Sequence, residues 1–241
     1  MTAESIAGRG IIRVNMMQHA IWAAGLIGHL ILIAVLLSTG GARRFPFFTL
    51  LIVFDVLRAL ALSLVLGHLP HPALVTASLA FEISDLVLEF GTLTELVVTA
   101  LRPLGGLRRV TLPILLLASG VVAVTHLAPV SHYTGRAAPL LLHFLLGILM
   151  FEWALVLALL LGALRLRWNS DVAVISFGFG LYSAALLFAG GYFRVGRDLS
   201  DYIFFSYLRI FVYLVVLLWW TLALWRKPKA SLRNQGSAVG S

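Results

Sequence analysis

Seven long apolar runs dominate the sequence and restrict its fold more than any other feature. Each run approaches or exceeds the roughly 20 helical residues needed to cross an apolar layer about 30 Å thick. Of the 241 residues, 61% are hydrophobic and 12% are charged, whereas a soluble domain typically has about 45–50% and about 25%. The sequence therefore predicts an all-α, polytopic membrane protein. The predicted spans are 17–39, 46–66, 72–101, 110–128, 138–163, 171–193 and 202–225.

The breaks between the runs are short and polar. "GGARR" and "RLRWNSD" are typical of them, and connections this short leave neighbouring helices antiparallel and packed together. We therefore predict one seven-helix transmembrane domain over residues 1–225, followed by a disordered cytoplasmic tail over 226–241. The first run is too long for the apolar region of a cleavable signal peptide, so we expect it to remain as the first span.

The lysine and arginine residues outside the apolar runs are divided unequally between the two sides of the predicted membrane. Eleven lie on one side of the predicted membrane and five on the other, while Arg58 and Arg209 lie inside runs. Because basic loops tend to stay in the cytoplasm, we expect the N-terminus outside and the C-terminus in the cytoplasm of a cell inner membrane. The eleven are Arg43, Arg44, Arg102, Arg108, Arg109, Arg165, Arg167, Arg226, Lys227, Lys229 and Arg233. The five are Arg9, Arg13, Arg136, Arg194 and Arg197. Trp168, Trp219, Trp220 and Trp225 predict an aromatic belt at the inner interface.

The stretch "FEISDLVLEFGTLTE" places carboxylates inside the third apolar run. A charge at the bilayer centre costs about 2.5–3.5 kcal/mol even on a lenient insertion scale. The spacing of 4, 3, 4 and 3 residues puts the polar positions on one face of a helix. We therefore expect an acidic stripe that faces the interior of the bundle. Its members are Ser78, Glu82, Asp85, Glu89 and Thr92.

Two arginines are candidates to neutralise these acids. Asp55 and Arg58 are three residues apart on the second span, a spacing that allows a local ion pair. On the seventh span, Arg209 and Tyr213 share a face. We expect Arg209 to lie within reach of Glu82 or Asp85, because an unpaired arginine in hydrocarbon is costly. Glu95 lies off the stripe, near headgroups or Arg102.

Carboxylates outnumber bases inside the predicted spans. The spans contain five carboxylates but only the two arginines named above. The carboxylates are Asp55, Glu82, Asp85, Glu89 and Glu152. The three surplus acids must be protonated, bound to a cation, or exposed to a water-filled cavity. We expect at least one of Glu82, Asp85 and Glu89 to be protonated at neutral pH, and Glu89 is our choice.

Two further polar residues complete the predicted interior network. His29, in the middle of the first span, is the one other candidate cation, although a lone histidine in an apolar span is more often a packed core residue. Glu152 is expected to face inward. The alternative for the whole network is a purely structural one, in which the polar groups hold helices together through hydrogen bonds.

Several function classes lack their signatures. The sequence has no cysteine, no hydrolase nucleophile elbow and no set of three zinc-type ligands at one depth. Its two lysines lie beyond the last span, so a retinal Schiff base there is excluded. We predict neither metal nor cofactor, and an enzyme is the less favoured class. The net charge is +8, and the basic residues that produce it flank the apolar runs. This arrangement predicts contact with anionic lipid headgroups at the cytoplasmic loops and not with nucleic acid.

Two segments carry a resemblance. With "ELVVTALRPLGGLRR" (95–109) closing the third span and "GFGLYSAALL" (178–187) opening the sixth, the chain resembles a loose group of uncharacterised bacterial seven-helix integral membrane proteins. It is distantly similar to the seven-helix input modules that precede sensor kinases. This resemblance implies a sensory role, with any output supplied by a separate partner chain, and it assigns no residue a role.

The leading hypothesis is therefore a non-enzymatic sensory or receptor-like membrane module with an interior acidic site. The alternative is a proton- or cation-coupled transporter or channel that uses the carboxylates of the third span. A membrane-embedded enzyme is the third reading.

Overall fold

The computed structural model describes residues 3–64, 71–102, 106, 109, 113–117, 120–121, 137–163, 170–195 and 199–226. Across these residues the secondary structure is helical, which confirms the all-α prediction. The helices are α1 (Ala3–Thr39), α2 (Gly41–Arg44), α3 (Pro46–Leu64), α4 (His71–Ala100), α6 (Ala137–Ala163), α7 (Asp171–Val195) and α8 (Leu199–Trp225).

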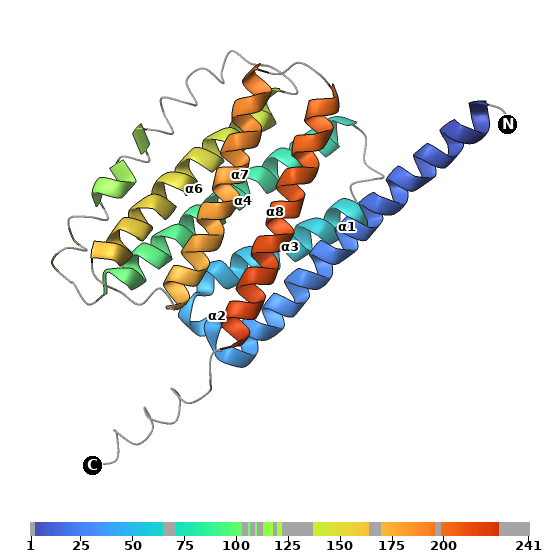
Figure 1. Ribbon diagram of the computed structural model, residues 1–241. Helices are drawn as coiled ribbons and strands as arrows, with labels where there is room; N and C mark the ends of the chain where they lie inside the picture. Colours follow the sequence, from blue (N-terminus) through green and yellow to red (C-terminus); the bar gives the residue numbers. More distant parts are fainter. Residues whose placement is uncertain are drawn as a thin grey trace.

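The helix bounds follow the apolar runs closely. Five helices, α3, α4, α6, α7 and α8, begin and end within three residues of a predicted range. Helix α1 starts earlier than predicted, and its first turns project beyond the bundle (Figure 1). Gly40, with a φ of 73°, separates α1 from α2 in a conformation that glycine adopts without steric cost. The predicted span 110–128 lies mostly outside the described residues, as does the predicted tail beyond Arg226.

The six long helices form a closed ring. Contacts run in the order α1, α3, α4, α6, α7, α8 and back to α1, and α4 also contacts α7. Helix α2 contacts α1 and α3 at one end of the ring (Figure 1). The first and last helices are therefore neighbours, although the whole chain separates them.

The interior of the ring is divided along its length. Toward the α2 end it is apolar and tightly packed. Buried side chains there include Leu32, Val35 and Leu36 of α1, Phe48, Leu51 and Ile52 of α3, Leu96, Val97 and Leu101 of α4, and Val216, Leu217, Trp220 and Leu224 of α8. The charged residues Asp55, Arg58, Asp85, Glu89 and Arg209 lie in the other half.

Trp220 belongs to this apolar core and not to a surface belt. It is 2% exposed, and its ring packs edge-on against Phe48 at a centroid distance of 5.0 Å. Its indole N–H donates to the Ile175 carbonyl at 3.3 Å. The belt predicted for Trp220 is therefore wrong, whereas Trp219 and Trp225 are exposed on the outer surface.

Three helices contain segments that are long and apolar enough to cross a membrane, among the residues that the structure describes. They are Ala20–Thr39, Asp171–Phe188 and Tyr207–Trp225. More than one such segment indicates a multi-pass membrane protein.

Candidate functional site: a charged cavity inside the helix ring

A partly open cavity of about 320 Å³ occupies the polar half of the ring. Five helices, α1, α3, α4, α7 and α8, supply its walls. Its volume lies at the lower end of the range of about 300–1,000 Å³ found for small-molecule sites. The charged side chains in its lining are Asp55, Arg58, Asp85, Glu89 and Arg209, and His29, Tyr182 and Tyr213 lie beside them.

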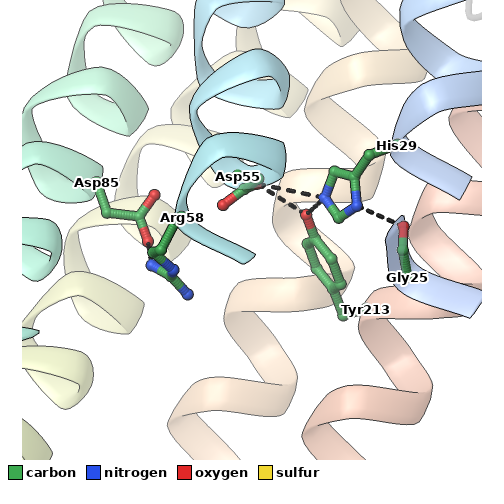
Figure 2. Close-up of polar contacts among 6 residues, drawn as sticks. All are labelled: Gly25, His29, Asp55, Arg58, Asp85 and Tyr213. Carbon is green, nitrogen blue, oxygen red and sulfur yellow. Dashed lines mark hydrogen bonds and ion pairs between the residues drawn. The ribbon is translucent and has the colours of Figure 1, made fainter. Parts of the chain in front are cut away.

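Arg58 and Asp85 form an ion pair between α3 and α4. The Arg58 guanidinium donates from Nη1 to Asp85 Oδ2 (Figure 2). This corrects the expected local pair of Arg58 with Asp55, three residues away on the same helix. The α4 backbone brings Asp85 within reach of the guanidinium, while Asp55 turns toward α1 and α8.

Asp55 joins a hydrogen-bonded triad with Tyr213 and His29. The Tyr213 hydroxyl donates to Asp55 Oδ2 at 2.9 Å and lies 2.6 Å from His29 Nε2. The other ring nitrogen, Nδ1, lies 2.5 Å from the carbonyl oxygen of Gly25. Figure 2 shows Tyr213 between the imidazole and the carboxylate. The triad ties α8 to α1 and α3 in the middle of the ring.

The two ring nitrogens of His29 face different partners. A carbonyl oxygen can only accept, so Nδ1 donates to Gly25. Nε2 lies 2.6 Å from the Tyr213 hydroxyl and 3.5 Å from Asp55 Oδ2. The imidazole is therefore held in place from both sides of the ring.

Glu89 is the acid without a partner in the cavity. It is 7% exposed, and its Oε2 atom is buried without a hydrogen bond. Burying a carboxylate without a partner costs more free energy than any other arrangement open to it. The expectation that Glu89 is the neutral member of the stripe stays a prediction, and the cavity beside it offers a second way to compensate the charge.

Arg209 lines the same cavity from α8. No ion pair of Arg209 occurs within the described part of the chain, since Asp85 is taken by Arg58. The expectation that Arg209 lies within salt-bridge or single-water reach of Glu82 or Asp85 stays a prediction, although Asp85 itself pairs with Arg58. Tyr182 of α7 lines the same cavity as Arg209 and Glu89.

Other predicted residues lie elsewhere. Glu82 is outside the cavity lining, but its charge acts on Arg58. Glu152 projects from α6, which is not a wall of the cavity, and its Oε2 is buried without a hydrogen bond. Thr92 is fully buried below the cavity. Within the described ranges no cluster of three or more acidic, histidine or cysteine side chains is placed to hold a metal ion.

Glu95 has a structural role that its sequence position did not reveal. Its carboxylate accepts the backbone N–H groups of Phe47 at 3.4 Å and Phe48 at 3.2 Å. These are unpaired donors in the first turn of α3, where a negative charge is favourable. Glu95 thus caps α3 from α4 and does not reach Arg102.

Sequence reasoning missed two contributors to the site and its surroundings. Tyr182 lies on α7 in the run "GFGLYSAALL", where nothing but its hydroxyl distinguishes it from a packing residue. Asp171 begins α7, as the predicted span 171–193 has it, but the hydrogen bond that it accepts from Arg44 at 2.7 Å was not predicted. An acid at the first turn of a helix was the available signal.

Comparison with known proteins gives no relative to set beside this geometry. No family model, no curated protein and no solved structure matches the chain.

Proposed function

We propose that this chain is a receptor-like, non-enzymatic module of the cell inner membrane that binds a small polar ligand in the cavity and passes the signal to a separate partner chain. One observation carries the proposal: Glu89, 7% exposed, lines a cavity large enough for a small molecule and has a buried carboxylate oxygen without a hydrogen bond. An unsatisfied buried polar group costs free energy, and a polar ligand in the cavity would reduce that cost. The resemblance to sensor-kinase input modules implies the same role.

The outer surface supports a membrane position for all six long helices. Each exposes at least one large apolar side chain, and such a surface around a whole ring fits a lipid environment better than water. Examples, one from each helix, are Leu37, Leu57, Val87, Leu159, Phe177 and Phe211. Together with the predicted span 110–128, these helices make up the proposed seven-span bundle.

The positions of the breaks support the proposed orientation. Arg44 bonds Asp171 and Glu95 bonds the start of α3, so the breaks near residues 45 and 170 and the end of α4 lie at one end of the ring. These are breaks that the basic residues assign to the cytoplasm. The cavity lies in the other half, so we propose that it opens toward the outside.

Access to the cavity tests the proposal. The chain has no cysteine, so Ala59→Cys places one thiol in the cavity wall and Ala100→Cys places one in the apolar core. Each variant is treated in intact cells and in inverted membrane vesicles with a membrane-impermeant cationic methanethiosulfonate reagent. We expect Ala59→Cys to react from the outside only and Ala100→Cys to react from neither side.

The other outcomes decide between functions. Reaction of Ala59→Cys from both sides would favour the second candidate, a proton- or cation-coupled transporter or channel, which the hydrogen-bonded row of His29, Tyr213 and Asp55 supports. Absence of reaction from either side would overturn both, because a cavity closed to water leaves the polar groups with a purely structural role.

A further inference from the structure

We infer that the ligand of the cavity is a small zwitterion, a molecule that carries one ammonium and one carboxylate on a short apolar frame. This inference rests on the proposed binding function and adds the chemical class of the ligand. It follows from which charges of the cavity are already compensated within the protein and which are not.

Most of the charge in the cavity is compensated internally. Arg58 and Asp85 neutralise each other as an ion pair. Asp55, Tyr213 and His29 hydrogen-bond one another, and His29 Nε2 lies 3.5 Å from Asp55 Oδ2. Neither group needs a ligand to satisfy it.

Two groups of the lining remain, and a cationic group bound at Glu89 would replace the proton that this carboxyl is predicted to carry. Glu89 on α4 has a buried oxygen without a hydrogen bond, and Arg209 on α8 makes no ion pair with any residue the structure describes. Both line the same cavity. A simple amine would satisfy Glu89 and leave Arg209, and a simple carboxylate would do the reverse. A zwitterion compensates both, with its ammonium at Glu89 and its carboxylate at the guanidinium, which binds carboxylates through paired hydrogen bonds.

The rest of the lining fits the frame of such a molecule. Tyr182 lines the same cavity, and its hydroxyl can both donate and accept a hydrogen bond. Ile21, Leu26, Ile210 and Leu214 supply apolar surface. The volume of about 320 Å³ restricts the ligand to the size of a single amino acid or a similar molecule.

The test uses leucine and two derivatives as probes. Leucine is the zwitterion, leucine amide keeps the ammonium alone, and N-acetyl-leucine keeps the carboxylate alone. Glycine, phenylalanine and their matching derivatives vary the apolar frame. Binding to the purified full-length protein in lipid nanodiscs is measured by isothermal titration calorimetry. We expect at least one zwitterion to bind about ten- to a hundredfold more tightly than its two derivatives, because each derivative loses one charge-assisted hydrogen-bonding partner.

Variants assign each end of the ligand. Glu89→Gln is expected to weaken the zwitterion and the amide, and Arg209→Gln to weaken the zwitterion and the N-acetyl derivative, each by about tenfold or more. Glu152→Gln, which alters another buried carboxylate outside the cavity, and Arg43→Gln, an exposed arginine on α2, are the matched controls and should leave affinity unchanged.

Failure of this inference is separable from failure of the proposed function. Amides that bind as well as zwitterions, with no dependence on Arg209, would overturn the zwitterion and identify an amine site. If no probe binds while Ala59→Cys still reacts from the outside, Glu89 and Arg209 compensate each other through water; the zwitterion is then overturned and the accessible cavity stands.

Discussion

At the scale of single residues, the ion pair of Arg58 and Asp85 illustrates what holds charge inside this bundle. Both side chains are largely buried, at 29% and 12% exposure. Removing one partner of a buried pair leaves the other uncompensated, which typically costs about 3–5 kcal/mol. Removing both avoids that penalty. The pair is thus expected to matter more through the cost of breaking it than through the attraction it supplies.

A double-mutant cycle measures this coupling. We expect Arg58→Gln and Asp85→Asn each to lower the free energy of unfolding by about 3 kcal/mol, and the double variant to lose clearly less than the sum. Unfolding in mixed detergent micelles gives the values. Arg44→Gln is the control, because its partnership with Asp171 is at the surface, with Arg44 67% exposed, and should contribute at most about 1 kcal/mol. Additive losses at Arg58 and Asp85 would contradict the coupling.

The cluster of interior charges could be predicted from the sequence, but its pairing could not. Helical spacing shows that Asp55 and Arg58 share a face of α3, and that Asp85 and Glu89 share a face of α4. It does not show which helix stands opposite each face. That depends on the order of helices around the ring and on their rotation, which arise from packing over the whole bundle. Arg58 therefore pairs with Asp85, and Asp55 pairs with Tyr213. In both pairs the partners are more than 20 residues apart in the sequence.

At the scale of helices, α7 and α8 approach each other through a glycine. The Trp220 indole of α8 lies against Gly178 of α7 so closely that an added Cβ would overlap the ring. A Cβ added at Gly180, two residues on, would lie 3.4 Å from the Cβ of Ala154 of α6, close to ordinary contact. Small residues at such positions let helix backbones and large side chains pack closely.

The two glycines therefore predict opposite responses to alanine. Gly178→Ala is expected to lower the free energy of unfolding by about 1–3 kcal/mol, because the rigid indole is held by its bond to Ile175 and by the rings of Phe48 and Phe179. Gly180→Ala is expected to be neutral or stabilising, since alanine favours a helix. Thermal unfolding of both variants is the comparison. Equal stability of the two would show that Trp220 can move aside.

The helix bounds were predictable because apolar runs and their polar breaks report on them directly. The cap that Glu95 places on α3 was not, because the donors it satisfies lie 48 and 47 residues earlier in the chain. Spacing along one helix carries no information about such a contact. Trp220 was misassigned for a related reason: its position near a helix end fits an interface, whereas its face points inward.

At the scale of the whole molecule, the basic residues predict an orientation that fusions can test. We expect a reporter after Ser241 to be active in the cytoplasm and one before Met1 to be active outside, from the eleven-to-five division of lysine and arginine. Green fluorescent protein and alkaline phosphatase serve as the two reporters, since each is active on one side only. Activity of both fusions on one side would contradict seven spans. A reversed pair would contradict the orientation alone.

The closed ring has a consequence for the order in which the protein is made. His29 on α1 hydrogen-bonds Tyr213, which is synthesised 184 residues later. At a synthesis rate of about 5–20 residues per second, the ribosome needs roughly 10 to 40 seconds to reach Tyr213. Arg58 and Asp85 are only 27 residues apart, so α3 and α4 can enter the bilayer as a charge-compensated hairpin. Asp55 also meets an earlier residue, because its Oδ2 lies 3.5 Å from His29 Nε2 of α1. Until α8 arrives, the side of the nascent bundle between α1 and α7 stays open, and Arg209 and Tyr213 are missing from the cavity wall. We therefore expect the cavity to form only after the last helix has been made.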